Sequence, residues 1–275
     1  MGYAWYGPAV RTVRELMSLD GRVAVLTGGA GHIGLACAEA LAELGAQVVI
    51  VDRELGSCEA RAADIGRRFG IEALPLVADL EVAGACQEVI AATVTQLGRI
   101  DILVNNAAYT GASGIKGYAV PFPEQSIEAW EAAVRVNLTA PFVLAQAAFC
   151  ELAKHRGCIV NVGSIYGNVG PQNVLYEGTT MGNPAAYAAT KGGISQLTRH
   201  LATVMAPAVR VNCVSPGGVA RGQPEAFVHR YTARTPLGRM ATEEDFKGAF
   251  AYLASAASAY VTGQELLVDG GWTAW

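Results

Sequence analysis

Residues 22–34 read RVAVLTGGAGHIG and combine three patterns that together decide the fold. The first six residues, RVAVLT, are a largely apolar run rich in β-branched residues, which predicts a buried strand. A turn containing Gly28, Gly31 and Gly34 comes next, and a helical pattern follows over 31–44. Glycines between a strand and a helix let a phosphate group approach the backbone and the positive end of the helix. The stretch therefore predicts a dinucleotide-binding unit.

The same alternation of strand and helix continues outward to the C-terminus, and no Pro- or Ser-rich linker interrupts it. Continuous apolar strands joined by helices are typical of a parallel sheet covered on both faces. We predict one α/β domain over residues 21–275, a Rossmann-like, doubly wound, parallel seven-stranded sheet. Its strands are expected at 22–27, 47–52, 72–79, 101–106, 158–164, 209–216 and 265–270, and its helices near 31–44, 55–69, 82–97, 126–155, 184–206 and 243–254.

Residues 1–20 are interpreted as an N-terminal leader that packs on the domain or on a neighbouring subunit. Val10, Val13, Leu16 and Met17 recur at helical spacing, which favours a short amphipathic turn. The leader has no basic region and too short an apolar run for a signal peptide, so a cytoplasmic location is expected.

The overall composition argues against several classes of function. The 275 residues carry a formal net charge of −4 with 16% charged residues, which does not favour nucleic acid as a partner. The most apolar charge-free segment, 157–176, is interrupted by polar residues, so we expect no membrane span there. The six cysteines and four histidines lack the spacing of a zinc site or a disulfide framework, and no metal is expected.

Asp52 stands at the end of the second predicted strand, 24 residues after Gly28. A carboxylate in this place binds both hydroxyls of the adenosine ribose and repels a 2′-phosphate, so the sequence favours NAD over NADP. Arg53 weakens this preference, because an adjacent guanidinium can accept that phosphate. Asp79 and Leu80 are expected to border the adenine, and a helix N-cap is the alternative role for Asp79.

A helix that begins at Asn183–Pro184 carries the first catalytic candidates, with Asn183 expected as its N-cap. Tyr187 and Lys191 then lie at i and i+4 on one face of this helix. An ammonium near a phenol lowers the pKa of the phenol from about 10, which suits a group that exchanges protons near neutral pH. Taken alone, the same pair is equally consistent with a surface contact.

From Arg22 to Gly271 the chain resembles the short-chain dehydrogenase/reductase (SDR) family. The order and the spacing of the motifs together carry the resemblance, because each motif alone is common. The matching pieces are TGGAGHIG (27–34), Asp52, VADL (77–80), NNAA (105–108), VNL (136–138), NVGS (161–164), YAATK (187–191), SPG (215–217) and VDGG (268–271).

The resemblance implies a catalytic tetrad. Tyr187 would be the general acid/base, and Lys191 would tune it and bind the nicotinamide ribose. Ser164 would bind the reacting oxygen, and Asn137 would hold a water molecule in a proton relay. Together with Tyr187 and Lys191, the residues expected to bind the cofactor are Gly28, Gly31, His32, Ile33, Gly34, Asp52, Arg53, Asp79, Leu80, Asn106, Ala107, Pro216, Gly217 and Val219.

Three single positions depart from the family pattern. His32 stands where the phosphate loop of the family has its second glycine, and it is expected to begin the helix near the pyrophosphate. Ala108 makes NNAA of the usual NNAG. Arg221 replaces a threonine that contacts the nicotinamide carboxamide, so backbone groups of 217–219 would take over that contact. The Arg221 side chain would face an anionic substrate or the solvent.

The largest departure is the interval of 23 residues between Ser164 and Tyr187, which is longer than in most members of the family. We expect substrate loops near 109–122 and 165–183 that form a polar cleft beside the reacting carbon, suited to a hydroxyl-rich ligand. Either loop could equally be an oligomer contact. The insert and the closing GWTAW also resemble a bacterial branch of the family associated with surface-sugar biosynthesis. The candidate substrate residues are Tyr109, Tyr176, Glu177, Thr179 and Arg221.

The function predicted from these observations is an NAD-dependent interconversion of a secondary alcohol and a ketone, on a sugar or a polyol. An NADP(H)-dependent reductase of an acyl, aryl or alicyclic ketone is one alternative. A non-enzymatic dinucleotide-binding subunit or regulator is another, which an intact tetrad disfavours. The expected partners are a small-molecule substrate and further copies of the chain, since the resemblance implies a dimer or a tetramer.

Overall fold

Seven parallel strands form one sheet in the order β3-β2-β1-β4-β5-β6-β7, as predicted. The computed structural model describes residues 10–275 of the chain. The order of the strands reverses direction between β1 and β4, and ligands of such sheets bind at the carboxyl ends of the strands at this point. The strands are β1 (Val23–Thr27), β2 (Gln47–Asp52), β3 (Ala73–Val77), β4 (Ile102–Asn105), β5 (Cys158–Val162), β6 (Arg210–Pro216) and β7 (Glu265–Val268).

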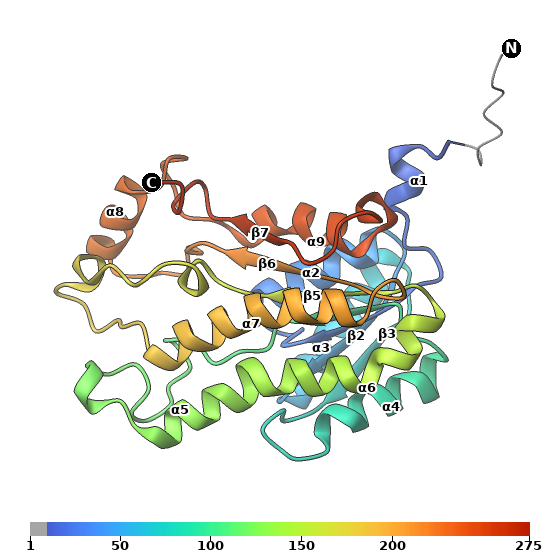
Figure 1. Ribbon diagram of the computed structural model, residues 1–275, viewed down its shortest axis with the longest axis horizontal. Helices are drawn as coiled ribbons and strands as arrows, with labels where there is room; N and C mark the ends of the chain where they lie inside the picture. Colours follow the sequence, from blue (N-terminus) through green and yellow to red (C-terminus); the bar gives the residue numbers. More distant parts are fainter. Residues whose placement is uncertain (1–9) are drawn as a thin grey trace, which may run out of the picture.

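Helices cover both faces of the sheet, so the chain is a single Rossmann-like domain (Figure 1). Alternate residues of each strand point to opposite faces; Leu26 and Ile50 enter one buried apolar cluster, whereas Val25 and Val49 enter the other. The first cluster lies under α2 (His32–Glu43), α3 (Leu55–Phe69) and α9 (Lys247–Ala254). The second lies under α4 (Ala85–Leu97), α6 (Ala140–Lys154) and α7 (Ala185–Val204).

The long helix expected over 126–155 is interrupted by a π-helical turn. The segment consists of α5 (Ile127–Val134), the π turn η2 (Arg135–Thr139) and α6. By length and composition alone, Ile127–Lys154 could cross a membrane, but α6 packs on the sheet and on α4. The π turn contains the buried Asn137, and such turns are frequent at functional sites.

The sequence did not predict α8 (Glu225–Ala233), which lies beside the C-terminus at the end of the molecule away from α1 (Figure 1). Its Tyr231 stacks on the buried indole of Trp272, with ring centroids 5.8 Å apart. Trp272 therefore packs within its own chain, whereas Trp275 is 75% exposed. Short helical turns also occur at η1 (Phe122–Glu124), η3 (Ile165–Gly167), η4 (Asn173–Tyr176), η5 (Glu243–Phe246) and η6 (Ala256–Ser258).

The helical turn expected in the leader is present as α1 (Val13–Met17), which contacts η6. Only part of its expected apolar face is buried. Leu16 and Met17 are partly covered, whereas Val10 and Val13 are exposed. The part of the leader over residues 1–9 lies outside the described residues.

Candidate active site

A cleft of about 680 Å³ lies at the carboxyl edge of the sheet. Residues that follow β1, β2, β3, β4, β5 and β6 line it, together with two side chains of α7. Of the residues predicted from the sequence, it brings together Gly28, Gly31, His32, Ile33, Asp52, Arg53, Asp79, Leu80, Asn106, Ala107, Tyr109, Ser164, Tyr187, Lys191, Pro216, Gly217, Val219 and Arg221. Gly34 and Asn137 lie behind its wall.

The glycine loop after β1 has the shape that a diphosphate needs. Gly28 has φ +62°, a left-handed conformation that favours glycine. A Cβ on Gly34 would lie 2.1 Å from the carbonyl oxygen of Gly28, so the loop closes tightly on the start of α2. Gly31 precedes α2 and provides no capping side chain, so the first amide groups of the helix remain available to an anion. The loop therefore fits the pyrophosphate of a dinucleotide.

Asn106 braces this loop from the neighbouring strand. Its Nδ2 donates to the carbonyl oxygens of Thr27, at 3.1 Å, and Gly28, at 3.0 Å. The backbone N–H groups of Asn106 and Ala107 donate to the hydroxyl of Thr27. The Asn106 amide thus holds the shape of the phosphate loop. Asn106 also lines the cleft, so its contact with the cofactor stays a prediction.

Asp52 ends β2 and Arg53 follows it, and the two side chains are held by different contacts. The Asp52 carboxylate accepts a hydrogen bond from the neighbouring backbone N–H at 2.8 Å. Arg53 Nη1 donates to Tyr109 Oη at 3.0 Å, and its guanidinium carbon lies 5.3 Å from the centre of that ring. The Tyr109 hydroxyl in turn donates to Glu81. Burial, reinforced by Glu81, raises the pKa of Tyr109 to about 12, so the phenol stays protonated at neutral pH.

Lys191 and Tyr187 lie on one side of α7, as their spacing predicted. The Lys191 ammonium is buried, lies 5.7 Å from the centre of the Tyr187 ring and donates to the Val162 carbonyl at 2.6 Å. Burial lowers the pKa of Lys191 to about 8. Burial raises the pKa of Tyr187, and the Ser164 side chain opposes this rise. The net shift of the Tyr187 pKa is therefore upward, opposite to the expected lowering, because desolvation dominates.

Asn137 ties two parts of the site together from behind. Its Oδ1 accepts from the backbone N–H of Tyr109 at 2.7 Å, and its Nδ2 donates to the Tyr109 carbonyl at 3.0 Å. Nδ2 also lies 3.2 Å from the hydroxyl of Thr190 on α7. The π turn therefore links the segment after β4 to the helix that carries Tyr187.

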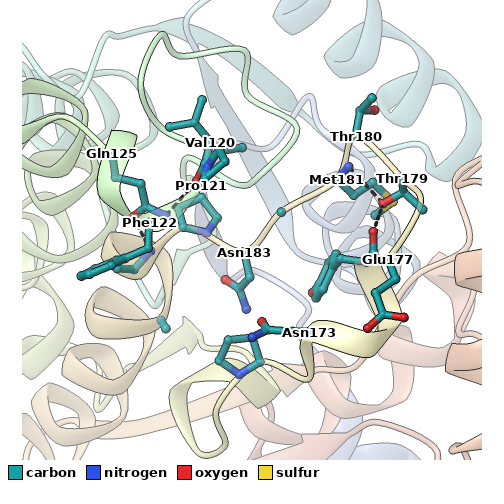
Figure 2. Close-up of a pocket in the computed structure, with 17 residues that line it drawn as sticks. Val120, Pro121, Phe122, Gln125, Asn173, Glu177, Thr179, Thr180, Met181 and Asn183 are labelled. Carbon is teal, nitrogen blue, oxygen red and sulfur yellow. Dashed lines mark hydrogen bonds between the residues drawn. The ribbon is translucent and has the colours of Figure 1, made fainter.

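The polar side chains of the insert lie elsewhere than expected. Of the residues 170–183, only Met181 lines the cleft. Tyr176, Glu177 and Thr179 line a second cavity of about 710 Å³ (Figure 2). Tyr176 packs against Phe227 of α8, with ring centroids 5.5 Å apart. The sequence did not predict this helix, and the contact places the insert away from the reacting groups.

Asn183 does not cap α7, contrary to expectation. The helix begins at Ala185, Pro184 occupies the N-cap position, and the Asn183 side chain makes no capping bond. Gln125 Oε1 accepts the Ala185 N–H at 3.0 Å instead. Asp79 is likewise no helix N-cap: its Oδ1 accepts the Glu81 N–H at 3.0 Å, in a turn ahead of α4.

Arg221 and His32, two departures from the family pattern, both approach Glu243. Arg221 Nε donates to Glu243 Oε1 at 3.2 Å, and His32 Nδ1 lies 3.5 Å from the same oxygen. The predicted substrate residue Arg221 is therefore held at the wall of the cleft. Three further polar side chains line the cleft. Thr110 and Ser113 belong to the substrate loop expected near 109–122, although these two residues were not singled out, whereas Gln223 lies in a segment after β6 without a local signal.

Ser164→Ala is expected to shift the pH dependence of alcohol oxidation to higher pH. Oxidation requires the Tyr187 hydroxyl to release its proton, and the Ser164 side chain lowers the pKa that burial raises. Activity is lost as the pH falls through the Tyr187 pKa, so loss of the Ser164 side chain moves this acidic limb of kcat/KM to higher pH. Profiles of kcat/KM against pH for wild type, Ser164→Ala and the hydroxyl-retaining Ser164→Thr measure the shift. An unchanged limb in Ser164→Ala would contradict this coupling.

The chain is similar to known oxidoreductases over almost its whole length. The family described as enoyl-(acyl carrier protein) reductase matches residues 28–273. A cis-4-hydroxycyclohexanecarboxylate dehydrogenase of Sinomonas cyclohexanicum is 37% identical over 260 residues, which are 92% of this chain and 97% of that protein. A galactitol 2-dehydrogenase (L-tagatose-forming) of Cereibacter sphaeroides is 32% identical over 274 residues, 95% of this chain and 99% of that protein.

Solved structures agree with these relatives. The crystal structure of a gluconate 5-dehydrogenase from Burkholderia cenocepacia, in complex with NADP and tartrate, has a TM-score of 0.83 and 33% identity. The match covers 96% of this chain and all of that one. The crystal structure of a short-chain type dehydrogenase/reductase from Mycobacterium marinum has a TM-score of 0.84 and 30% identity, with 96% and 99% covered.

Proposed function

The chain belongs to the short-chain dehydrogenase/reductase family, and from that premise we propose that it is an NAD-dependent dehydrogenase that acts on a sugar or a polyol. Enzymes of this family that act on CH–OH groups interconvert a secondary alcohol and a ketone. The observation that carries the proposal is one cleft in which the phosphate loop and the side chains of Ser164, Tyr187 and Lys191 meet. A binding protein or regulator needs the phosphate loop but not these three groups beside it.

The side chains of the cleft support the following division of labour. The deprotonated Tyr187 hydroxyl accepts the proton of the substrate hydroxyl. Ser164 Oγ accepts the Tyr166 N–H at 3.2 Å, so its own proton remains available to the substrate oxygen. Lys191 uses one donor for Val162 and keeps two for the ribose of the cofactor. A nicotinamide held by Lys191 and the phosphate loop would supply the hydride acceptor for the carbinol carbon, and the oxidised substrate would be a ketone.

The preference for NAD is supported by the surroundings of Asp52. Its carboxylate lines the cleft and carries no ion pair among the described residues, so a negative 2′-phosphate would meet an uncompensated charge. Arg53, which follows Asp52 and could neutralise that phosphate, is already bonded to Tyr109. Relatives of known structure bind NADP, so a direct comparison of the two cofactors is required.

Tyr109→Phe is expected to strengthen NADP binding by about tenfold and to change NAD binding little. The substitution removes the hydroxyl that holds Arg53, and a hydrogen bond to a charged group contributes about 1.5–3 kcal/mol. The released guanidinium can then turn toward a 2′-phosphate. Calorimetric titration of both cofactors into wild type and Tyr109→Phe gives the two affinities. Tyr118→Phe is the matched control, because the Tyr118 hydroxyl bonds a backbone carbonyl and not Arg53. Equal NADP affinities in all three proteins would show that the Tyr109 hydroxyl does not restrain Arg53.

The proposal of a sugar or polyol rests on the polar side chains at the cleft and on the relatives. Thr110, Ser113, Arg221 and Gln223 offer hydroxyl, guanidinium and amide groups in the cleft that Tyr187 also lines. The relative from Cereibacter sphaeroides is named for galactitol and the solved structure for gluconate. A panel of polyols, aldonates and cyclic alcohols with NAD and with NADP, followed by the absorbance of the reduced nicotinamide, tests the assignment. If the protein oxidised no compound of this panel with either cofactor, the assignment would be contradicted.

An alicyclic alcohol is the second candidate substrate. It is favoured by the relative that is named for a hydroxycyclohexane carboxylate. A carboxylate on the ring would suit the cleft, because Arg221 lies in its wall. Preference for cyclohexanols over polyols in the same panel would support this candidate.

A homo-oligomer is also proposed. Apolar side chains are exposed along α5 and α6, among them Trp130, Phe142 and Phe149. Contiguous exposed apolar surface marks interaction sites. Light scattering of the purified protein measures the subunit number, and a monomer at micromolar concentration would contradict this proposal.

A further inference from the structure

We propose that the cavity between residues 119–125 and 171–185 is a second binding site, for a neutral, hydroxyl-rich ligand. It has a volume of about 710 Å³, in the range of small-molecule sites. Ala185 and Ala188 of α7 line it, whereas Tyr187 and Lys191 of the same helix line the catalytic cleft. Met181 is the residue that the two spaces share, so the insert forms the wall between them. This second site is distinct from the catalytic cleft, and the proposal does not depend on the reaction proposed above.

The Asn183 amide is the polar group that points to a ligand. Figure 2 shows this side chain projecting into the cavity between Phe122 and Asn173. Its Nδ2 and Oδ1 are both buried, and neither has a hydrogen-bond partner among the described residues. The usual task of such a residue, capping the following helix, is performed by Gln125. A buried amide without partners is unfavourable, so its position calls for a group that binds it.

The chemistry of the ligand follows from what the amide lacks. Asn183 needs an acceptor for its N–H groups and a donor for its oxygen at the same place. A carboxylate or a phosphate only accepts, and an ammonium only donates, whereas neighbouring hydroxyl groups do both.

The rest of the lining agrees with a polyol or a sugar. Glu177 is the one charged side chain among the described residues around the cavity, which disfavours an anion and provides an acceptor for further hydroxyls. Pro121, Phe122 and Pro171 add apolar surface against which the C–H groups of such a ligand can pack.

Protection of an introduced thiol tests the site without using catalysis. Ala188→Cys places a thiol in the cavity, and Ala189→Cys, one residue further, places it on the exposed surface outside. Both are made in a Cys150→Ser background, because Cys150 is the exposed cysteine of the chain. Rates of alkylation by N-ethylmaleimide are measured with and without saturating galactitol. We expect galactitol to slow the reaction of Ala188→Cys at least fivefold and to leave Ala189→Cys unchanged.

Two further measurements in the same experiment test which ligand the cavity binds and whether Asn183 binds it. Gluconate, which has a similar chain and a negative charge, should protect at least fivefold less well than galactitol. Asn183→Leu, combined with Ala188→Cys, should abolish the protection while the melting temperature shows that the protein remains folded. Equal protection of both thiols, or none, would overturn the proposal. So would a thiol at Ala188→Cys that reacts only after unfolding, since the cavity would then be closed to a small molecule. Oxidation of galactitol by wild type is assayed separately, so failure of the site and failure of the proposed reaction are distinguishable.

Discussion

Tyr187→Phe is expected to lower kcat for alcohol oxidation by about 10²- to 10⁴-fold, the usual contribution of a general acid or base. The substitution removes one oxygen from a side chain that lines the cleft, and it leaves the phosphate loop and Asp52 unchanged. NAD affinity and melting temperature should therefore stay close to those of wild type. Steady-state kinetics and calorimetric titration of NAD measure the two effects separately.

Tyr176→Phe is the matched control for this experiment. The Tyr176 hydroxyl lies 2.6 Å from that of Tyr166, and its ring lines the second cavity, outside the catalytic cleft. Removal of the Tyr176 hydroxyl should lower kcat as well, but the fold-decrease should be at least ten times smaller than that of Tyr187→Phe. Retention of more than a tenth of the activity in Tyr187→Phe would show that another group moves the proton.

Gly34→Ala is expected to weaken NAD binding at least tenfold and to destabilise the fold. The added Cβ would lie 2.1 Å from the Gly28 carbonyl oxygen and 2.8 Å from Asn106 Nδ2, so the phosphate loop must shift. Forced overpacking usually costs about 1–3 kcal/mol. In a chain of this length that corresponds to a fall in melting temperature of roughly 2–10 °C. Thermal unfolding and NAD titration check both parts.

Gly31→Ala separates the two effects of the loop. At this position the Cβ would lie 3.3 Å from the Gly28 oxygen, and φ is −78°, which any residue adopts. The melting temperature should therefore change little. NAD affinity should fall, because Gly31 lies where the pyrophosphate approaches the backbone. Equal destabilisation by Gly31→Ala and Gly34→Ala would contradict the role assigned to the close contact at Gly34.

The fold and the cofactor cleft could be predicted from the sequence because their signals are local. A buried strand, a glycine turn and the start of a helix occupy 13 consecutive residues, 22–34, and the carboxylate of Asp52 ends the next strand. The carboxyl ends of parallel strands meet at one edge of the sheet, so residues after several strands must meet there as well. This rule explains why most of the predicted cofactor residues line one cleft.

The substrate side could not be predicted in the same way, because long-range packing decides it. The polar residues of the insert face a second cavity, since Tyr176 packs on α8, a helix without a clear sequence signal. Asn183 has the sequence signature of an N-cap, yet Gln125, 58 residues earlier, performs that task. Tyr109 was assigned to the substrate, whereas its hydroxyl holds Arg53 beside Asp52.

The sequence by itself thus determined the parallel sheet, the phosphate loop and the helix face shared by Tyr187 and Lys191, because each depends on spacing within a short segment. The tertiary structure alone decided the sign of the Tyr187 pKa shift, the two partners of the Tyr109 hydroxyl and the division of the loops into a cleft and a separate cavity. Those properties depend on burial and on contacts between segments far apart in the chain, and neither leaves a periodic pattern in the sequence.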